Sequence, residues 1–352
     1  MKVLGINPGS TSTKLAVYEH EKLLFEENIR HDDAELMKLA DLTAQLPYRL
    51  DAIMSVLEKR DFQLSSLAAV VGRGGMLKPM SSGTYFVDDH LLEDARSGKY
   101  GNHASNLGSI IAAEIAREYQ LPVFIVDPVG VDELIEEARI SGLADIERKS
   151  HVHALNIKAV SRKIAAELGK ELADTSFVAA HLGGGISVAA LKGGRMIDVN
   201  NAENEGPFSP ERAGGLPAKQ LVQLCFSGKY SEKELLQRMT KQGGIFSYLG
   251  TKSVIEIEQR VKSGDPDAAL VLKAMVHQIA KEIGAMATVL EGKADGIILT
   301  GGISHSEMIT EWIREKVSFI GEVFVLPGEA EMEALAFGAL RVLTGQEEAE
   351  RY

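Results

Sequence analysis

Short apolar runs alternate along the chain with longer stretches in which apolar residues recur every three or four positions. Short runs bounded by turn residues are typical of buried strands, and the longer stretches are typical of amphipathic helices. The alternation of the two predicts an α/β fold. The predicted strands are Val3–Ile6, Ala68–Val71, Val123–Val126, Phe177–Ala180, Gly296–Leu299 and Val323–Leu326.

The periodic stretches predict a helix after most of these strands. We expect Pro47 to separate the first two helices, because proline lacks an N–H donor and clashes with the preceding turn. A helix over Glu331–Leu343 is expected to return to the N-terminal domain after the chain crosses back. The other predicted helices are Ala34–Leu46, Leu50–Lys59, Asn106–Tyr119, Ala154–Leu168, Glu232–Met239 and Ala268–Leu290.

The chain has 352 residues, 45% of them hydrophobic, and this is enough for two domains rather than one. We expect residues 1–150 and about 330–352 to form the first domain, and residues 151–329 to form the second. Thirty-eight Lys and Arg against fifty Asp and Glu give a net charge of -12, which repels polyanions. Nucleic acids and acidic membranes are therefore excluded as expected partners, and any anion site must be built locally from arginines and backbone amides.

Cys225 is the single cysteine of the sequence. It excludes an intrachain disulfide, and we expect it to be a buried structural thiol in a reducing compartment. Apolar runs in the sequence are all shorter than the ~20 residues that a membrane-spanning helix needs. A cytoplasmic protein is expected.

Two segments of the chain resemble each other. Residues 3–17 and 177–191 both read as a strand, a glycine-containing turn and a second strand, with Asn7 and His181 in equivalent places. The repeat predicts two similar domains. The alternative is that two glycine-containing hairpins resemble each other by chance over a dozen residues.

Small and hydroxylated residues at these turns suit phosphate binding, because backbone N–H groups can approach phosphate oxygens where no side chain intervenes. A third glycine turn follows the strand at 296–299 and suits the nucleoside. For the first turn the alternative is a simple β-turn with Lys14 in solvent. The candidate nucleotide- and phosphate-binding residues are Ser10, Thr11, Ser12 and Lys14, then His181, Gly183, Gly184 and Gly185, then Gly301, Gly302 and Ile303.

The order of these turns, with other motifs between them, resembles the acetokinase family, which belongs to a superfamily with sugar kinases, heat-shock ATPases and actin. Residues 72–75 and 327–335 resemble butyrate kinases more than acetate kinases. The segments that carry the resemblance are Asn7–Lys14, Gly72–Gly75, Val126–Pro128, Ser150–His153, His181–Gly185, Pro210–Gly215, Leu299–Gly302 and Pro327–Leu335.

The resemblance implies two duplicated ribonuclease-H-like (actin-like ATPase) domains with a nucleotide cleft between them. The N-terminal domain would bind the acyl and phosphoryl groups and the C-terminal domain the nucleotide. The implied reaction is reversible transfer of the γ-phosphoryl group of ATP, with Mg²⁺, to butyrate, giving butanoyl phosphate and ADP. Isobutyrate, propionate or acetate are alternative acids, and an ATP-driven switch is the non-enzymatic alternative. A homodimer or higher homo-oligomer is a family-based expectation.

A carboxylate acceptor is ionised at neutral pH and needs no general base, so positioning and charge neutralisation carry the catalysis. By resemblance, Arg73 holds the carboxylate, Arg212 binds phosphoryl oxygens and Asp127 orients the reacting groups. From the residues alone, an arginine is more often a surface ion pair, and an aspartate before a proline is more often a strand-end cap. The resemblance assigns catalysis to Asn7, Arg73, Asp127, His151 and Arg212, and acid binding to Arg73, Gly74, Gly75 and His103.

Gly74 and Gly75 follow Arg73 where acetate kinases carry bulkier residues. The missing side chains are expected to make room for a longer acyl tail, each buried methylene contributing up to about 0.8 kcal/mol. The alternative is that the two glycines serve only the backbone. His153 is left undecided between the site and packing, and the four remaining histidines without motif context are expected at the surface or in packing: His20, His31, His90 and His277.

Two departures from the family pattern concern the metal and the nucleotide. Acetate kinases carry a glutamate after the third glycine turn that helps place magnesium, whereas this chain has Ser304-His305-Ser306. We therefore expect ATP phosphates and water to hold Mg²⁺, with Asn7 in the outer shell. At Thr251-Lys252-Ser253 relatives tend to carry an Asp and an Arg beside the nucleotide, so nucleotide affinity or base preference is expected to differ.

Overall fold

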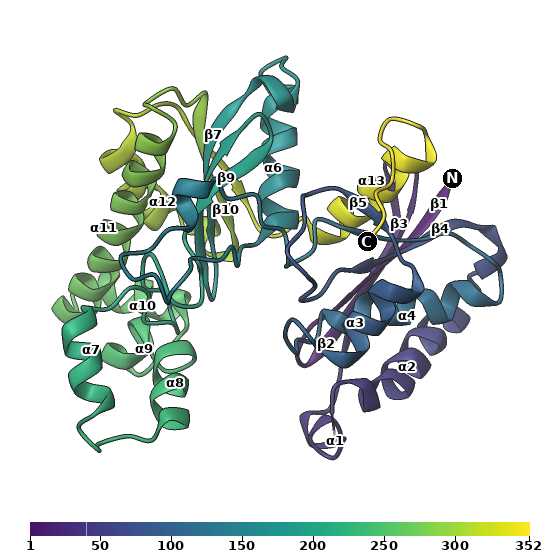
Figure 1. The fold of residues 1–352 in the computed structure, drawn as a ribbon, viewed down its shortest axis with the longest axis horizontal. Coiled ribbons are helices and arrows are strands. Elements are labelled where there is room, and N and C mark those ends of the chain that lie inside the picture. The colour runs from purple at the N-terminus through teal and green to yellow at the C-terminus, as the bar shows by residue number, and fades with distance from the viewer. Residues whose placement is uncertain (40) are drawn as a thin grey trace. The chain divides into compact units, whose positions relative to one another are not determined.

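The computed structural model describes residues 1–39 and 41–352 and contains two compact units (Figure 1). Unit 1 comprises Met1–Asp132 and Ala330–Tyr352, and unit 2 comprises Glu133–Glu329. Residues 133–150 are expected in the first domain, whereas the structure groups them with unit 2. They group with unit 2 because the segment bonds to a strand there: Ile135 N–H donates to the Ile197 carbonyl at 3.0 Å, and the Glu133 carboxylate accepts from Met196 N–H at 2.8 Å.

Unit 1 is built on a mixed six-stranded sheet with the order β3-β2-β1-β4-β6-β5. The β1–β4 and β4–β6 pairs are parallel and the remaining pairs are antiparallel. The strands are β1 (Lys2–Pro8), β2 (Ser12–Glu19), β3 (Lys22–Arg30), β4 (Leu67–Arg73), β5 (Thr84–Phe86) and β6 (Val123–Val126).

Unit 2 is built on a mixed five-stranded sheet with the order β11-β10-β7-β8-β9. If the strands of each unit are counted in chain order and β5 is left out, both sheets have the order 3-2-1-4-5. The internal repeat seen in the sequence therefore extends to the whole sheet of each unit. The strands are β7 (Ser176–Leu182), β8 (Ile186–Lys192), β9 (Arg195–Val199), β10 (Gly296–Gly301) and β11 (Val323–Pro327).

Helices cover both faces of the unit 1 sheet. Helix α13 (Glu331–Leu343) packs on β1, β4 and β6 from one face, and α4 (Asn106–Arg117) packs on them from the other (Figure 1). A Cβ atom on Gly72 of β4 would lie 2.2 Å from the carbonyl oxygen of Gly108 in α4. Glycines at both positions let the two backbones touch, which fixes the end of β4. The other helices of unit 1 are α1 (Asp33–Met37), η1 (Thr43–Gln45), α2 (Leu46–Lys59), η2 (Leu64–Ser66) and α3 (Asp89–Ser97).

The helix predicted over Ala34–Leu46 is wrong in extent. Helix α1 ends at Met37 and a 3₁₀ turn covers Thr43–Gln45, while Ala40 lies outside the described residues. Helix α2 begins at Leu46 with Pro47 in its first turn. A proline is well tolerated there, because the first N–H groups of a helix have no partner within the helix.

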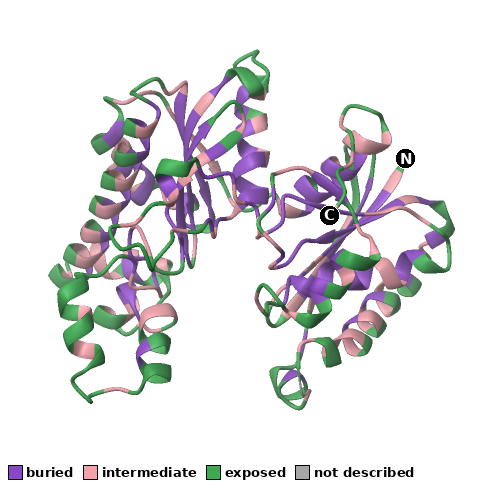
Figure 2. Cartoon of the chain, in the orientation of Figure 1, coloured by how far each residue is buried: buried purple, intermediate pink, exposed green. Residues whose placement is uncertain are grey.

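Unit 2 has α6 on one face of its sheet and α11 on the other, with α12 packed beside α11 (Figure 1). Each unit has its own apolar core, and the buried residues follow the strands and the inner sides of these helices (Figure 2). The helices of unit 2 are α5 (Glu136–Arg139), α6 (Ala154–Glu167), η3 (Leu172–Asp174), α7 (Ala218–Cys225), α8 (Glu232–Thr240), α9 (Gly244–Leu249), α10 (Val254–Lys262), α11 (Pro266–Val289), η4 (Gly302–His305) and α12 (Glu307–Val317).

The expectation that Cys225 is a buried thiol is wrong. The residue is exposed at the end of α7, a helix that buries none of its residues. Within residues 1–39 and 41–352, no helix combines the length and the apolar character that crossing a bilayer requires.

Candidate active site

The two predicted glycine hairpins are present and are equivalent. In unit 1, Asn7 lies opposite Lys14 and one further pair precedes the turn. In unit 2, His181 lies opposite Ser187, again with one further pair before the turn. Asn7 and His181 therefore hold the same position relative to their turns.

A buried arginine supports the first turn from behind, and the sequence analysis did not single it out. The guanidinium of Arg49, from α2, donates to the carbonyl oxygens of Ser10 at 3.0 Å and Ser12 at 2.9 Å, and to the Thr13 hydroxyl at 3.0 Å. It also donates to the Gln45 side-chain oxygen. Burial lowers the pKa of Arg49 from its ordinary value. Because all these acceptors are neutral, the charge of Arg49 favours an anion at the turn.

His31 completes this support. Its Nε2 lies 2.8 Å from the Thr13 hydroxyl, and its backbone N–H donates to the Thr11 carbonyl at 2.9 Å. Burial, with a smaller effect of the nearby Arg49 charge, lowers the pKa of His31 to about 4, so the ring is neutral at neutral pH. Ser10 and Thr11 at the tip are exposed, and Ser12 and Lys14 are half-buried.

Replacing Arg49 with methionine is expected to destabilise unit 1 by about 2–4 kcal/mol, because the substitution leaves buried carbonyl and hydroxyl oxygens without a donor. Amide exchange at residues 9–13 should accelerate accordingly, as measured by hydrogen-exchange mass spectrometry. The matched control is Arg60→Met just after the same helix, whose partner Glu27 is exposed. This control should lower the stability of unit 1 by less than about 1 kcal/mol. Equal protection of the turn in both variants would contradict the role of Arg49.

Three side chains from separate elements of unit 1 meet at the end of the first hairpin. The Asn7 side-chain amide donates to Glu331 Oε2 at 2.6 Å, and Arg73 Nη1 lies 3.2 Å from Glu331 Oε1. Arg73 is the last residue of β4 and is buried, and Glu331 begins α13, where the helix dipole favours a carboxylate. The structure thus brings together Asn7 and Arg73, which were predicted, and Glu331, which was not. The signal that could have identified Glu331 is an acidic residue in the first turn of the last helix.

Asp127 lies next to this group in the sheet. It directly follows β6, whose last residue Val126 pairs with Arg73. Asp127 is fully buried, its Oδ1 accepts from Gly83 N–H at 2.9 Å, and its φ of 39° is in the left-handed region. A non-glycine residue in this region typically carries about 1–3 kcal/mol of strain. The surrounding hydrogen bonds hold the carboxylate in this conformation.

The expectation that Gly74 and Gly75 open space for an acyl tail is wrong. A Cβ atom on Gly74 would lie 2.4 Å from the Pro128 side chain, and one on Gly75 would lie 2.1 Å from Asn106 Oδ1. The glycines allow neighbouring backbone to approach, and the missing side chains leave no room. His103, predicted near the acid, is exposed and pairs through Nδ1 with the Ser105 hydroxyl at 2.8 Å.

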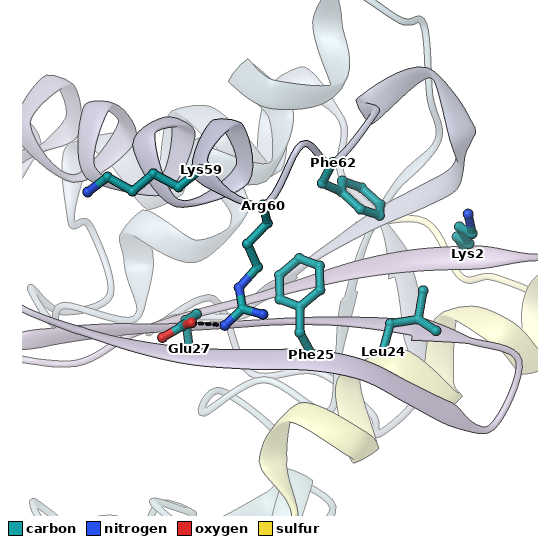
Figure 3. Close-up of a pocket in the computed structure, with 7 residues that line it drawn as sticks. All are labelled: Lys2, Leu24, Phe25, Glu27, Lys59, Arg60 and Phe62. Atoms are coloured by element: carbon teal, nitrogen blue, oxygen red, sulfur yellow. Dashed lines mark hydrogen bonds and ion pairs between the residues drawn. The ribbon is translucent and has the colours of Figure 1, made fainter.

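Two surface hollows of unit 1 differ in whether candidate site residues line them. One, of about 620 Å³, lies between β3 and the end of α2 and contains none of the candidate residues (Figure 3). Its Arg60 is paired with Glu27 and lies 4.8 Å over the Phe25 ring. The second, of about 630 Å³, lies beside the first turn and is lined by Thr11, Ser12, Asn28, Arg30, His31, Asp32 and Asp33.

In unit 2, His181 is held within a cluster of histidines. Its ring stacks on that of His153, with centroids 3.8 Å apart and planes 10° from parallel. His181 Nδ1 lies 2.8 Å from Asn156 Oδ1, and His153 Nδ1 lies 3.0 Å from the Ser187 hydroxyl. His153, left undecided from the sequence, therefore contacts the predicted phosphate loop. His151 is half-buried, with Nδ1 3.5 Å from Glu203 Oε2.

Arg212 lies over the second glycine turn. A Cβ atom on Gly185 would lie 2.6 Å from its Nη1, and this nitrogen donates to the Ala202 carbonyl at 3.0 Å. Beside it, Glu211 lies near Gly184 and pairs with Lys252 at 2.7 Å. Lys252 belongs to the segment in which a departure from the family was noted, and it places a cation near the turn.

The third glycine turn is a close backbone contact. Gly301, with a φ of 89°, would place a Cβ atom 2.4 Å from the Leu182 carbonyl oxygen, whereas Gly302 has open space around it and Ile303 is buried. The two serines that follow serve the backbone. Ser304 donates to the Thr300 carbonyl, and Ser306 caps α12 by accepting from Ile309 N–H.

Comparison with known proteins places this architecture. The structure is similar to acetate kinase from Porphyromonas gingivalis, with 19% sequence identity and a TM-score of 0.82 over 97% of this chain and 99% of that one. A propionate kinase from Francisella tularensis subsp. tularensis SCHU S4 has 18% sequence identity and a TM-score of 0.76, over 95% of this chain and 98% of that one. A ROK hexokinase from Thermus thermophilus has 14% sequence identity and a TM-score of 0.51, over 98% of this chain and 100% of that one. The fold is thus that of acetate kinase and ROK sugar kinases, which confirms the predicted actin-like ATPase class.

The family model described as the acetokinase family matches residues 145–334. The chain belongs to the acetokinase family. It is therefore a phosphotransferase whose acceptor is a carboxyl group, as the sequence analysis expected.

Proposed function

We propose that the protein transfers the γ-phosphoryl group of ATP reversibly to butyrate, forming butanoyl phosphate and ADP. The observation that carries the proposal is the buried guanidinium of Arg73 beside Asn7 and Glu331. An arginine fork in a buried position binds a carboxylate bidentately and neutralises its charge. A butyrate carboxylate held in this way can approach a phosphoryl group that is itself negative.

The acid is its own nucleophile, so no side chain has to remove a proton from it. One carboxylate oxygen attacks the γ-phosphorus in line, and the bond from this phosphorus to the oxygen bridging it to ADP breaks. In this proposal Arg73 holds the acid, and Asp127 keeps the backbone beside it in place through Gly83. His181, Arg212 and the amides of Gly183–Gly185 bind phosphate oxygens, while His151 donates to the transferring group. The turn at Gly301–Ile303 receives the nucleoside.

The residues present fit a magnesium ion. Glu331 Oε2 accepts from the Asn7 side-chain amide at 2.6 Å, and each of the two side chains carries an oxygen of the kind that suits Mg²⁺. No cluster of three or more His, Cys, Asp or Glu suited to a metal occurs in the described part of the chain. In this proposal nucleotide phosphates and water supply most ligands of the ion. We propose that Glu331, rather than the Ser304–Ser306 segment, holds this ion, with Asn7 beside it. Bound Mg²⁺ would neutralise phosphoryl oxygens.

The choice of butyrate rests on the likeness of residues 72–75 and 327–335 to butyrate kinases, since the spatial argument from Gly74 and Gly75 does not hold. Acetate and propionate are the second candidates, because the similar solved structures include kinases for those acids.

Trapping of acyl phosphate with hydroxylamine tests the proposal, because hydroxylamine captures activated acyl groups. Acetate, propionate, butyrate, isobutyrate and valerate are compared in parallel with Mg-ATP. We expect a maximum of kcat/KM at butyrate. A maximum of kcat/KM at acetate or propionate would support the proposed reaction but contradict the choice of butyrate as its substrate. Slow ATP hydrolysis that ignores every acid would favour an ATP-driven switch.

A further inference from the structure

The loop between β11 and α13 carries two glutamates that contact the two glycine hairpins. Glu331 bonds to Asn7 of the first hairpin, as described above. Glu329, two residues earlier, lies beside His181 of the second, with its Oε1 3.4 Å from Nε2. Since Asn7 and His181 are equivalent positions of the repeat, each hairpin has a carboxylate at the same place.

The position of Glu329 is set by the third glycine turn. Gly301 and Gly328 exchange two backbone hydrogen bonds, of 3.1 Å and 3.0 Å, immediately before Glu329. The Thr300 hydroxyl also donates to the Gly328 carbonyl at 3.2 Å. The backbone is therefore anchored to the end of β10, while the Glu329 side chain is 39% exposed.

The nitrogen that faces Glu329 is buried and poorly satisfied. The His181 side chain is 1% exposed, and its Nε2 has no aligned hydrogen bond in the structure. A Cβ atom on Gly183 would lie 3.2 Å from Nε2, so this nitrogen points at the glycine turn, where a phosphate would bind. Two features thus meet at one nitrogen: it is buried and faces the glycine turn, and a carboxylate oxygen lies 3.4 Å from it without an aligned hydrogen bond.

Other ionisable side chains lie around the ring and the turn. Arg212 lies over Gly185, and His153 stacks on His181. Glu211 is near Gly184 but is held by Lys252. The Glu329 carboxylate, by contrast, lies 3.4 Å from His181 Nε2.

We propose that the Glu329 carboxylate stands in for a nucleotide phosphate oxygen at His181 Nε2 and is displaced when the nucleotide binds. The inference rests on the proposed nucleotide site. A phosphate oxygen and the carboxylate cannot share one donor, because two anions at that distance repel each other in a partly buried site. Glu329 is therefore a built-in competitor that preserves the anion site in the ligand-free protein and lowers nucleotide affinity.

The test is the affinity for the Mg complex of AMPPNP, a non-hydrolysable ATP analogue, measured by isothermal titration calorimetry. Glu329→Gln removes the charge and retains the size, so it should lower Kd by about fivefold or more. The control is Glu315→Gln on the exposed side of α12, which removes the same charge away from the turn and should leave Kd unchanged. A residue that supported binding or local structure would give the opposite sign, a raised Kd.

Ring ¹⁵N shifts of His181, assigned with His181→Gln, provide the second measurement. Wild type and Glu329→Gln should differ at His181 without nucleotide and coincide when AMPPNP is bound, because the carboxylate has then left the ring. An unchanged or raised Kd in Glu329→Gln, or a shift difference that persists in the bound state, would overturn the inference. Failure of the wild type to bind AMPPNP would instead overturn the proposed function, and the inference with it.

Discussion

Replacing Arg73 with alanine is expected to lower kcat/KM for the acid about a thousandfold in the hydroxylamine assay. The guanidinium is buried at the end of β4 and is the group that would neutralise the substrate carboxylate. Removing a single charge-stabilising donor from a preorganised site typically costs about 10²–10³ in rate, and loss of bidentate binding adds to this. The variant also removes the guanidinium that lies 3.2 Å from the Glu331 carboxylate, so less positive charge faces an incoming acid.

Arg73→Lys is the matched variant. It retains the charge but not the planar fork, so its kcat/KM should fall between those of wild type and Arg73→Ala. The affinity for AMPPNP should change far less than the KM for the acid in both variants, because the acid is the ligand of Arg73. Near-normal turnover of Arg73→Ala with an unchanged circular dichroism spectrum would remove Arg73 from the site.

Replacing Lys158 with methionine is expected to destabilise unit 2 by about 3–5 kcal/mol, because it removes the buried ammonium that pairs with a buried carboxylate. Lys158 Nζ lies 2.7 Å from Glu133 Oε2, and both side chains are buried. The ammonium also donates to the Gly194 carbonyl, and Glu133 accepts from Met196 N–H. The pair ties the first residue of unit 2 to the β8–β9 hairpin.

Urea unfolding followed by tryptophan fluorescence measures this effect in the right unit, because Trp312 is the single tryptophan of the sequence and lies in α12 of unit 2. The double variant Glu133→Leu with Lys158→Met should recover part of the loss, since an apolar pair replaces an uncompensated charge. Its recovery should stay incomplete, because Met196 N–H loses its acceptor. A loss below about 1 kcal/mol in Lys158→Met would show that the pair is no stronger than an exposed one.

Local pattern was sufficient for much of the fold. All six predicted strands lie within β1, β4, β6, β7, β10 and β11, because a strand buried on both faces must be continuously apolar. The repeat was visible because each hairpin is a local structure whose turn demands small residues. The helix predicted over 34–46 is wrong in extent, because the spacing of apolar residues there does not show where tertiary packing ends a helix.

The candidate site also contains residues that local sequence identifies and residues that only the fold brings there. Asn7, Arg73, Asp127 and His181 could be found because each lies within one residue of the end of a strand, in a recognisable motif. Arg49 could not, because it lies in an ordinary helical sequence and acquires its role from a strand turn far away in the chain. Glu331 lies in a segment that carried the resemblance, but nothing local shows that it meets Asn7. The predicted space for an acyl tail at Gly74 and Gly75 is wrong, because the sequence shows that a side chain is missing but not what fills its place.

The sequence by itself determined the α/β class, the duplicated hairpins and the candidate anion-binding residues, since these depend on periodicity and on residues close together in the chain. The tertiary structure alone decided which carboxylate meets Asn7, what fills the space behind Arg73 and which anion faces His181. Those contacts join residues tens to hundreds of positions apart. They are set by how helices pack on the sheets, which no local pattern specifies.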